Sequence, residues 1–194
     1  MSPDGEARYE FRVFDDGLEV LRPLLSKLSS NSSLDQATET YIVTRLNIDA
    51  GVTIRGDCLE MKVLLAREGI LDLWQPSLVV QLPVSGDTLV DVIAPALGVT
   101  VDVPGDAQLT EAALVDIAQS VRGLASVSVG KQRSLFEIES CTAELTDVDL
   151  PGMRTQSVAL EGADFVNVMQ LVRRLGLEQR ANESYPCYLQ RRLF

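Results

Sequence analysis

Residues 8–14 read RYEFRVF, and charged and apolar side chains alternate along this stretch without a break. Arg8, Glu10 and Arg12 fall on one face of an extended chain, and aromatic and aliphatic side chains fall on the other. A period of two residues is typical of a half-buried β-strand. The stretch therefore predicts a strand with one charged and one apolar face, and only a sheet can bring several such faces together.

The two-faced pattern returns in later parts of the chain. Gly56-Asp57 is a tight turn between two such stretches, which predicts a hairpin. The longest run of alternation covers residues 126–148, where we expect a bend near Glu139. Strands are predicted over Glu39–Val43, Val52–Arg55, Leu59–Leu65, residues 126–148 and Arg154–Glu161.

Helical periodicity appears between these strands. Thr110 is a good N-cap for one helix, and Gly176 ends another. Helices are predicted over Leu18–Leu28, Thr88–Leu97, residues 111–121, Ala163–Leu175 and residues 184–194. About seven or eight mostly antiparallel strands with four or five helices form an α+β pattern.

Composition excludes several kinds of chemistry. The 194 residues include 17 Lys plus Arg, 28 Asp plus Glu and no His, which gives a formal charge of −11. Without histidine, Ser-His-Asp and Cys-His catalysis and His-ligated zinc are impossible within the chain. The acidic balance argues against DNA and against anionic membranes as partners, because both need an excess of basic residues.

The N-terminal residues and the three cysteines give expectations about cellular location and redox role. The N-terminal MSPDGEARYEF has neither the basic nor the apolar region of a signal peptide, and no run approaches 18 apolar residues, so we expect a cytoplasmic protein. Cys58, Cys141 and Cys187 are odd in number and far apart, which favours buried small hydrophobes over a disulfide framework. A homodimer is left open as the oligomeric state.

The charged strand faces predict an antiparallel β-barrel with an ionic interior, flanked by helices. Such an interior is costly unless its charges are paired or a ligand occupies it. Arg8 and Arg12 share one strand face, four residues and about 13 Å apart, and each calls for an anion from the protein or from a ligand. The cations of these faces are Arg8, Arg12, Arg55, Lys62, Lys131 and Arg133, and the carboxylates are Glu10, Glu60, Glu144 and Glu161.

The order of these motifs resembles the CYTH superfamily of triphosphate tunnel metalloenzymes, which includes thiamine triphosphatases, inorganic triphosphatases, class IV adenylate cyclases and RNA triphosphatases. The resemblance covers most of one predicted domain, 1–194, and marks residues 68–125 as an atypical insertion. The matching segments are RYEFR, VTIRGDCLEMKVL, GKQRSLFEIESCTAELTDV, SVALEG and NESYPCYL.

The resemblance implies roles for individual residues. It implies Glu10 and Glu161 as catalytic carboxylates, and Glu10, Glu144 and Glu161 as ligands of Mg²⁺ or Mn²⁺, with Asp147 as the alternative to Glu144. The family pattern Glu-x-Glu-x-Lys reads Arg8-x-Glu10-x-Arg12 here, and a late Glu-x-Glu reads Ala159-x-Glu161, so two metal ligands are lost. The resemblance matches Arg55, Lys62, Lys131 and Arg133 to residues that hold the phosphate chain, and we expect Arg8 and Arg12 to bind the substrate with them.

Three functions follow from this set of residues. The first is metal-dependent hydrolysis of a small polyanion that carries a triphosphate, either inorganic tripolyphosphate or an organic triphosphate, with cyclase activity as a variant that no base-recognition pocket supports. The alternative is a non-catalytic protein that binds polyphosphate or another anion. The third is a structural or interaction domain whose interior charges pair with each other.

Overall fold

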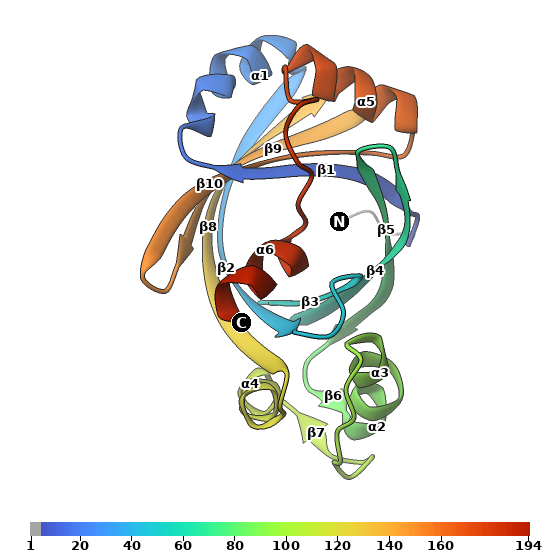
Figure 1. The fold of residues 1–194 in the computed structure, drawn as a ribbon. Coiled ribbons are helices and arrows are strands. Elements are labelled where there is room, and N and C mark those ends of the chain that lie inside the picture. The colour runs from blue at the N-terminus through green and yellow to red at the C-terminus, as the bar shows by residue number, and fades with distance from the viewer. Residues whose placement is uncertain (1–4) are drawn as a thin grey trace. The chain divides into compact units, whose positions relative to one another are not determined.

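The computed structural model describes residues 5–194 and contains a closed, antiparallel eight-stranded barrel flanked by helices (Figure 1). The strands follow the order β1-β10-β9-β8-β2-β3-β4-β5. The α+β barrel predicted from alternation is therefore confirmed. No helix within residues 5–194 combines the length and apolar character needed to cross a membrane. Residues 1–4, which belong to the stretch that argues against a signal peptide, lie outside the described residues.

The elements have the following bounds. The barrel strands are β1 (Arg8–Asp15), β2 (Asn31–Thr44), β3 (Ala50–Arg55), β4 (Cys58–Glu68), β5 (Leu71–Gln81), β8 (Leu124–Ile138), β9 (Cys141–Leu150) and β10 (Met153–Gly162). A small second sheet pairs β6 (Val84–Ser85) with β7 (Gln108–Leu109). The helices are η1 (Leu18–Leu21), α1 (Arg22–Leu28), α2 (Gly86–Thr88), η2 (Leu89–Ile93), α3 (Ala94–Ala96), α4 (Glu111–Ser120), α5 (Phe165–Arg174) and α6 (Tyr185–Leu193).

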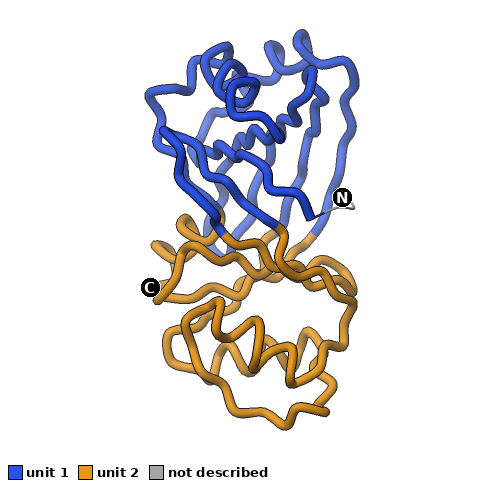
Figure 2. The backbone as a smooth tube through the Cα atoms, turned by 90° about the vertical axis from the view of Figure 1, so that its right-hand side faces the viewer, with its two compact units in different colours: residues 1–37, 64–75, 130–184 blue, residues 38–63, 76–129, 185–194 orange. Residues whose placement is uncertain are grey.

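The chain divides into two compact units (Figure 2). Unit 1 comprises residues 1–37, 64–75 and 130–184, and unit 2 comprises residues 38–63, 76–129 and 185–194. Strands β2, β4, β5 and β8 have residues in both units. Within residues 68–125, for which the sequence predicts an insertion, β5 is a barrel strand and the remainder holds β6, β7 and helices α2–α4. A single domain over 1–194 stays a prediction.

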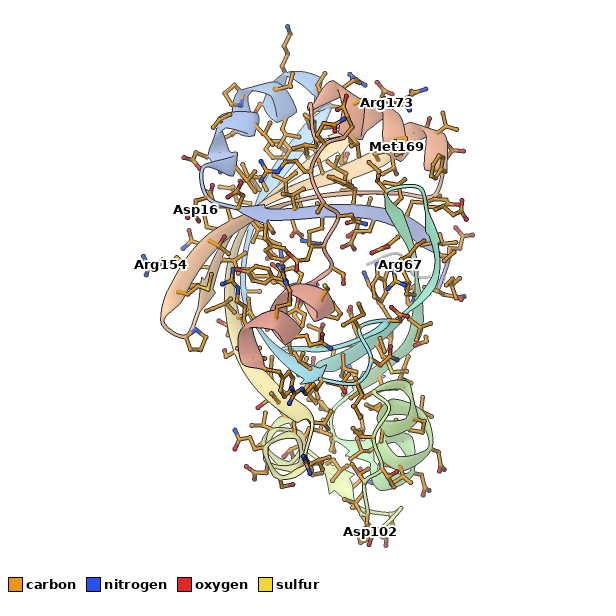
Figure 3. All side chains as sticks on the ribbon, in the orientation of Figure 1. Asp16, Arg67, Asp102, Arg154, Met169 and Arg173 are labelled. Atoms are coloured by element: carbon orange, nitrogen blue, oxygen red, sulfur yellow. The ribbon has the colours of Figure 1, made fainter. Side chains whose placement is uncertain are left out.

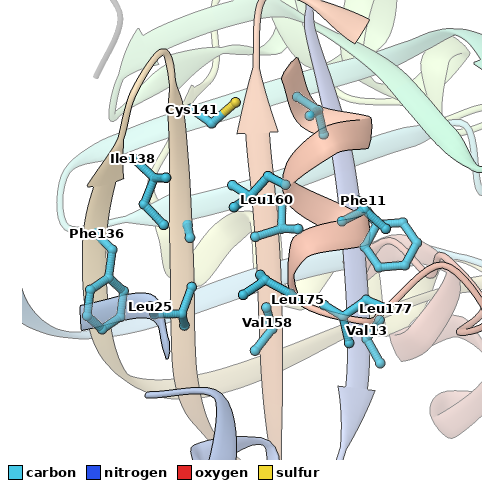
Figure 4. Close-up of a cluster of buried hydrophobic side chains, with 14 of the residues drawn as sticks. Phe11, Val13, Leu25, Phe136, Ile138, Cys141, Val158, Leu160, Leu175 and Leu177 are labelled. Carbon is cyan, nitrogen blue, oxygen red and sulfur yellow. The ribbon is translucent and has the colours of Figure 1, made fainter. Parts of the chain in front are cut away.

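The core of unit 1 lies between its strands and helices α1 and α5 (Figure 4). Phe11 of β1 and Leu160 of β10 are fully buried and face this core. Leu25 of α1 and Val168 of α5 are fully buried against them. The apolar face predicted from the alternation in residues 8–14 is therefore the face that the helices cover.

The ends of the helices follow local sequence signals. The Asp164 side chain accepts a 2.9 Å hydrogen bond from the Asn167 backbone N–H and so begins α5. Gly176, with φ of +67°, follows the end of that helix, as the sequence predicts. Thr110 likewise accepts a hydrogen bond from the Ala113 N–H at the start of α4.

Unit 2 has its own core around the hairpin of β3 and β4. Ile54 and Leu59 lie opposite each other in this hairpin and are buried. Ile93 of η2 and Leu114 of α4 belong to the same cluster and are also buried. Residues between β5 and β8 thus supply the apolar surface that covers this hairpin.

Strand β2 is longer than the sequence predicts. The predicted strand begins at Glu39, whereas β2 begins at Asn31. Residues 31–36 are polar or exposed and lack the apolar alternation that marks a half-buried strand. Their extended form depends on neighbouring backbone, as in the bond that the Ser30 N–H donates to the Glu137 carbonyl, and local sequence does not encode such a partner.

The bend predicted near Glu139 is a hairpin turn. Strand β8 ends at Ile138 and β9 begins at Cys141, where the two residues pair directly. Glu139 has φ of +55°, the left-handed conformation that reverses the chain here. The predicted single long strand is therefore wrong at this point, and the two strands lie side by side.

Candidate functional site

The charged side chains of unit 1 gather on the strand face opposite its helices. Glu10 lies directly opposite Glu161 in the register of β1 and β10. Arg12 lies opposite Ala159, which in turn lies opposite Glu144 of β9. We call the set Arg8, Glu10, Arg12, Lys131, Arg133, Glu144 and Glu161 the charged face of unit 1.

Arg12 lies at the centre of this face. Its Nε is 2.9 Å from Glu10 Oε1, its Nη1 is 3.3 Å from Glu144 Oε1 and its Nη2 is 3.8 Å from Glu161 Oε1. The side chain is 7% exposed, so these contacts form largely away from water. One guanidinium thus contacts all three carboxylates that the sequence predicts as metal ligands.

Ala159 gives the guanidinium room to reach Glu144. This residue stands between Arg12 and Glu144 in the sheet register and is almost fully buried. A methyl side chain at this position occupies little of the space above the strand, whereas the glutamate of the family pattern would extend into it. Arg12, where the family pattern has lysine, and Ala159, where it has glutamate, therefore lie opposite each other in the sheet.

The backbone of β1 at Arg12 is completed by the segment that precedes α6. The Arg12 N–H donates to Asn182 Oδ1 at 2.8 Å, and the Glu183 N–H donates to the Arg12 carbonyl at 2.8 Å. Asn182 also donates through Nδ2 to the Glu10 carbonyl. These bonds hold the strand that carries both Glu10 and Arg12, and nothing in the local pattern of residues 182–183 predicts them.

Two buried cations of β8 complete the surroundings of Glu144. Lys131 and Arg133 are each 4% exposed, and Arg133 Nε lies 3.5 Å from Glu144 Oε2. Thr146 donates its hydroxyl to Glu144 Oε1 at 2.8 Å. Burial has the largest effect and raises the pKa of Glu144, but Arg12, Lys131, Arg133 and the Thr146 hydroxyl together hold that pKa below its ordinary value.

The register also separates Glu144 from its predicted alternative. Glu144 lies on the charged face, whereas Asp147 is exposed and accepts a 2.7 Å hydrogen bond from Gln156 Nε2. Arg8 donates through Nη2 to Thr142 Oγ1 at 3.3 Å, beside Glu161 in the register of β9 and β10. Glu144 is therefore the acidic residue that joins Glu10 and Glu161.

The charged face does not fit a divalent metal ion. Within residues 5–194, no group of three or more Cys, Asp and Glu side chains is arranged to hold a metal. Mg²⁺ and Mn²⁺ require carboxylate and water oxygens close around one point. Glu10, Glu144 and Glu161 do converge, but the point on which they converge is the Arg12 guanidinium.

The remaining predicted cations, Arg55 and Lys62, lie in unit 2. Arg55 binds Glu39 Oε1 through Nε at 2.7 Å and through Nη2 at 2.6 Å. Glu39 is fully buried and also accepts a 3.0 Å hydrogen bond from the Tyr41 hydroxyl. Lys62 is partly buried on β4, opposite Gly51. Arg55 is therefore paired with the buried Glu39 within unit 2, and Arg55 and Lys62 are not among the residues of the charged face of unit 1.

Sequence patterns missed two carboxylates of these charge networks. Asp35 binds Arg133, with 2.5 Å between Asp35 Oδ2 and Arg133 Nη1, and Glu39 binds Arg55. Asp35 falls in the polar stretch for which no strand is predicted. Glu39 falls at the start of a predicted strand, where alternation with Tyr41 was the only signal that it faces inward.

Similarity by sequence is below detection, whereas similarity of structure is clear. No protein-family model and no curated protein sequence matches the chain. A conserved hypothetical protein from Pyrococcus furiosus superposes with a TM-score of 0.55 at 16% identity, over 92% of this chain and 98% of that chain.

Two further solved structures are of proteins named for an enzymatic activity. A candidate adenylate cyclase from Bacillus halodurans has a TM-score of 0.52 at 14% identity, over 95% of this chain and 96% of that chain. The Mimivirus capping enzyme triphosphatase has a TM-score of 0.52 at 9% identity, over 92% of each chain. At these identities the likeness establishes the fold alone. The chain therefore shares the fold of these solved structures, and its closed barrel flanked by helices is the fold that the strand motifs predict.

Proposed function

We propose that the charged face of unit 1 binds a small anion with linked phosphate groups, such as tripolyphosphate, without a metal ion and without hydrolysing it. The observation that carries this proposal is the position of Arg12 among Glu10, Glu144 and Glu161. An arginine side chain keeps its charge in proteins. It supplies permanently the positive charge that a metal would otherwise bring to these carboxylates.

The charge of this face favours an anion. Its seven side chains are four cations and three carboxylates, and Asp35, which binds Arg133, balances the fourth cation. An anion that replaces Asp35 therefore meets an excess of positive charge. Lys131 and Arg133 are buried, and the resemblance implies that these two residues hold the phosphate chain. Arginine presents a planar fork of donors that matches phosphate oxygens, which supports phosphate over a simple monovalent anion.

Metal-dependent hydrolysis of a triphosphate is the second candidate function. The observation that favours it is that Glu10, Glu144 and Glu161 remain on one face, and the lowered pKa of Glu144 keeps that carboxylate ionised at neutral pH. The triphosphatase among the structural neighbours supports the same candidate. Against it stands Arg12, because a guanidinium that binds these oxygens competes with a metal for them.

Titration calorimetry with tripolyphosphate tests the two candidates. The titration is run with EDTA and then with Mg²⁺ or Mn²⁺, and release of inorganic phosphate is followed in the same samples. We expect binding in EDTA, no release of phosphate, and weaker binding in Lys131→Met. The matched control is Arg154→Gln, because Arg154 is well exposed on β10 and is not part of the charged face (Figure 3).

The other outcomes contradict the proposal in distinct ways. Binding that requires metal, with turnover lost in Glu10→Gln and Glu161→Gln, would establish the hydrolase. An absence of binding under all conditions, in a protein with native circular dichroism, would leave a charge network that pairs only with itself. That second result would return the chain to the structural or interaction role.

A further inference from the structure

The contact between Arg133 and Asp35 joins a buried cation to an exposed carboxylate. Arg133 is 4% exposed, whereas the Asp35 side chain is 46% exposed. Asp35 Oδ2 lies 2.5 Å from Arg133 Nη1, within hydrogen-bonding distance. Asp35 is already partly hydrated, so its release into water would cost little free energy. Arg133 needs an anion at this position because its charge is buried.

A polar cavity of about 330 Å³ opens beside this ion pair within unit 1. Both Asp35 and Arg133 line it, and Arg22 at the start of α1 contributes a second guanidinium. Arg22 Nη1 donates to Ser134 Oγ at 2.6 Å, which places the guanidinium next to β8. Gln36 and Gln132 add carboxamide groups to the same lining. The cavity therefore combines two arginines, the carboxylates of Asp35 and Asp147, and neutral hydrogen-bonding groups, so it becomes cationic only when a carboxylate leaves it.

We propose that this cavity is a subsite for one phosphate group of the polyanion, with Arg133 and Arg22 as its cationic ligands. Asp35 fills the anion position on Arg133 in the free protein and leaves it when the phosphate binds. This inference rests on the proposed function, because the ligand is the same polyanion. The cavity, Arg22 and Asp35 are additional to the residues that the family resemblance implies.

Charge explains the direction of the exchange. A phosphate group within a polyphosphate carries more oxygens and neighbouring negative charge than the single carboxylate of Asp35, so it is the stronger partner for the arginine fork. The carboxylate and the phosphate repel each other, so both cannot remain on Arg133. Asp35 thus compensates the buried charge of Arg133 in the free protein and competes with the ligand for this arginine.

Substitution of Asp35 tests the exchange directly. Asp35→Asn removes the competing charge but keeps the size of the side chain. We expect tripolyphosphate to bind about five- to tenfold more tightly to this variant in EDTA, since a partly exposed ion pair and one repulsion are removed. Arg22→Gln should weaken binding by a similar factor if the second guanidinium contacts the phosphate.

Matched controls come from the exposed pair of Asp149 and Arg154. Arg154 Nε lies 3.5 Å from Asp149 Oδ1, and both side chains are well exposed. Asp149→Asn and Arg154→Gln should leave the affinity for tripolyphosphate unchanged. They reproduce the changes in net charge of the two test variants, so they exclude a general effect of charge on this acidic protein.

The outcomes separate this inference from the proposed function. If the unmodified protein binds tripolyphosphate and Asp35→Asn binds it equally or more weakly, Asp35 is not a competitor and the inference fails alone. Unchanged affinity in Arg22→Gln would exclude the cavity from the ligand site. If neither the unmodified protein nor Asp35→Asn binds tripolyphosphate, the proposed function fails as well.

Discussion

Arg12 joins three carboxylates that would otherwise repel each other in a poorly hydrated place. Its guanidinium is within 4 Å of Glu10, Glu144 and Glu161, and it is almost fully buried. Removal of one member of a buried charge group leaves the others uncompensated. The residue therefore has a stabilising role that does not depend on any ligand.

The first prediction concerns the stability of the Arg12→Gln variant. We expect its free energy of unfolding to fall by about 3–5 kcal/mol, because three carboxylates lose their shared cation. Urea denaturation at pH 7 measures the change. Arg154→Gln is the control, and as an exposed substitution it should shift stability by no more than about 0.5 kcal/mol. Equal stability of the two variants would show that other groups neutralise these carboxylates.

The second prediction removes the guanidinium at the centre of the charged face and restores the glutamate of the family pattern at residue 159. In the double variant Arg12→Gln/Ala159→Glu, four carboxylates face one region from which the competing guanidinium has been removed. We expect this variant to bind Mn²⁺ roughly tenfold or more tightly than the unmodified protein, since oxygen ligands suit this ion. Electron paramagnetic resonance of free Mn²⁺ measures the binding.

A neutral isostere provides the control for the metal experiment. Arg12→Gln/Ala159→Gln has the same side-chain volume at residue 159 and lacks the fourth charge. Its affinity for Mn²⁺ should stay near that of the unmodified protein. Equal binding by the two double variants would mean that position 159 does not face the carboxylates, in conflict with the register of β9 and β10.

Residue types and faces were predictable from sequence, but pairing was not. Strict alternation in residues 8–14 places Glu10 and Arg12 on one face, and the structure agrees. The partner of each charge depends on which strands become neighbours and in what register. Asp35 and Glu39 are separated from their arginines by 98 and 16 residues, so no local motif indicates these pairs.

At the scale of elements, the hairpin of β8 and β9 depends on a residue in an unfavourable conformation. Glu139 has φ of +55°, where its Cβ is crowded by the backbone. Its carboxylate binds Arg174 Nη1 of α5 at 2.8 Å, and both side chains are exposed. The residue in the strained turn thus also forms an ion pair with α5.

The third prediction is that Glu139→Gly stabilises the protein. Glycine adopts positive φ without crowding, so we expect a gain of about 0.5–1 kcal/mol after the loss of a weak exposed ion pair. Thermal unfolding measures the difference. Arg174→Gln removes the ion pair alone and should change stability by less than about 0.5 kcal/mol. A loss of stability in Glu139→Gly would show that the ion pair outweighs the backbone strain.

Strand β2 shows why hydrophobic periodicity does not detect a strand that has no buried face. Its second half is largely buried, and residues 39–43 are predicted correctly, whereas residues 31–36 are exposed on both faces. Alternation reports burial of one face, and a strand without a buried face leaves no such pattern. The part of β2 that carries Asp35 could therefore not be found from hydrophobic periodicity.

The fourth prediction concerns the whole molecule and its dependence on acid. The pKa of Glu144 is lower in the folded protein than in the unfolded chain, so the unfolded chain binds more protons as the pH falls. The stability from Glu144 is fully present above about pH 4.3, the ordinary glutamate pKa, and is lost as the pH falls through the lower, folded value.

Urea denaturation at several pH values from neutral to strongly acidic tests this dependence. The unmodified protein should lose stability in acid more steeply than Glu144→Gln. The variant should be less stable at pH 7 by about 1–3 kcal/mol, because its amide replaces a carboxylate that pairs with Arg12 and Arg133. Parallel pH profiles for the two proteins would show that Glu144 does not contribute to acid sensitivity.

In unit 1 the strands place the packing core and the charged face on opposite sides of one layer. Phe11 belongs to the core and its neighbour Arg12 to the charged face. A substitution that changes the charges therefore leaves the contacts with α1 and α5 in place. Requirements of ligand chemistry and requirements of folding therefore act on alternate residues, so the charges can change while the architecture persists. Such independence is compatible with one barrel fold in proteins that share only 9–16% identity with this chain.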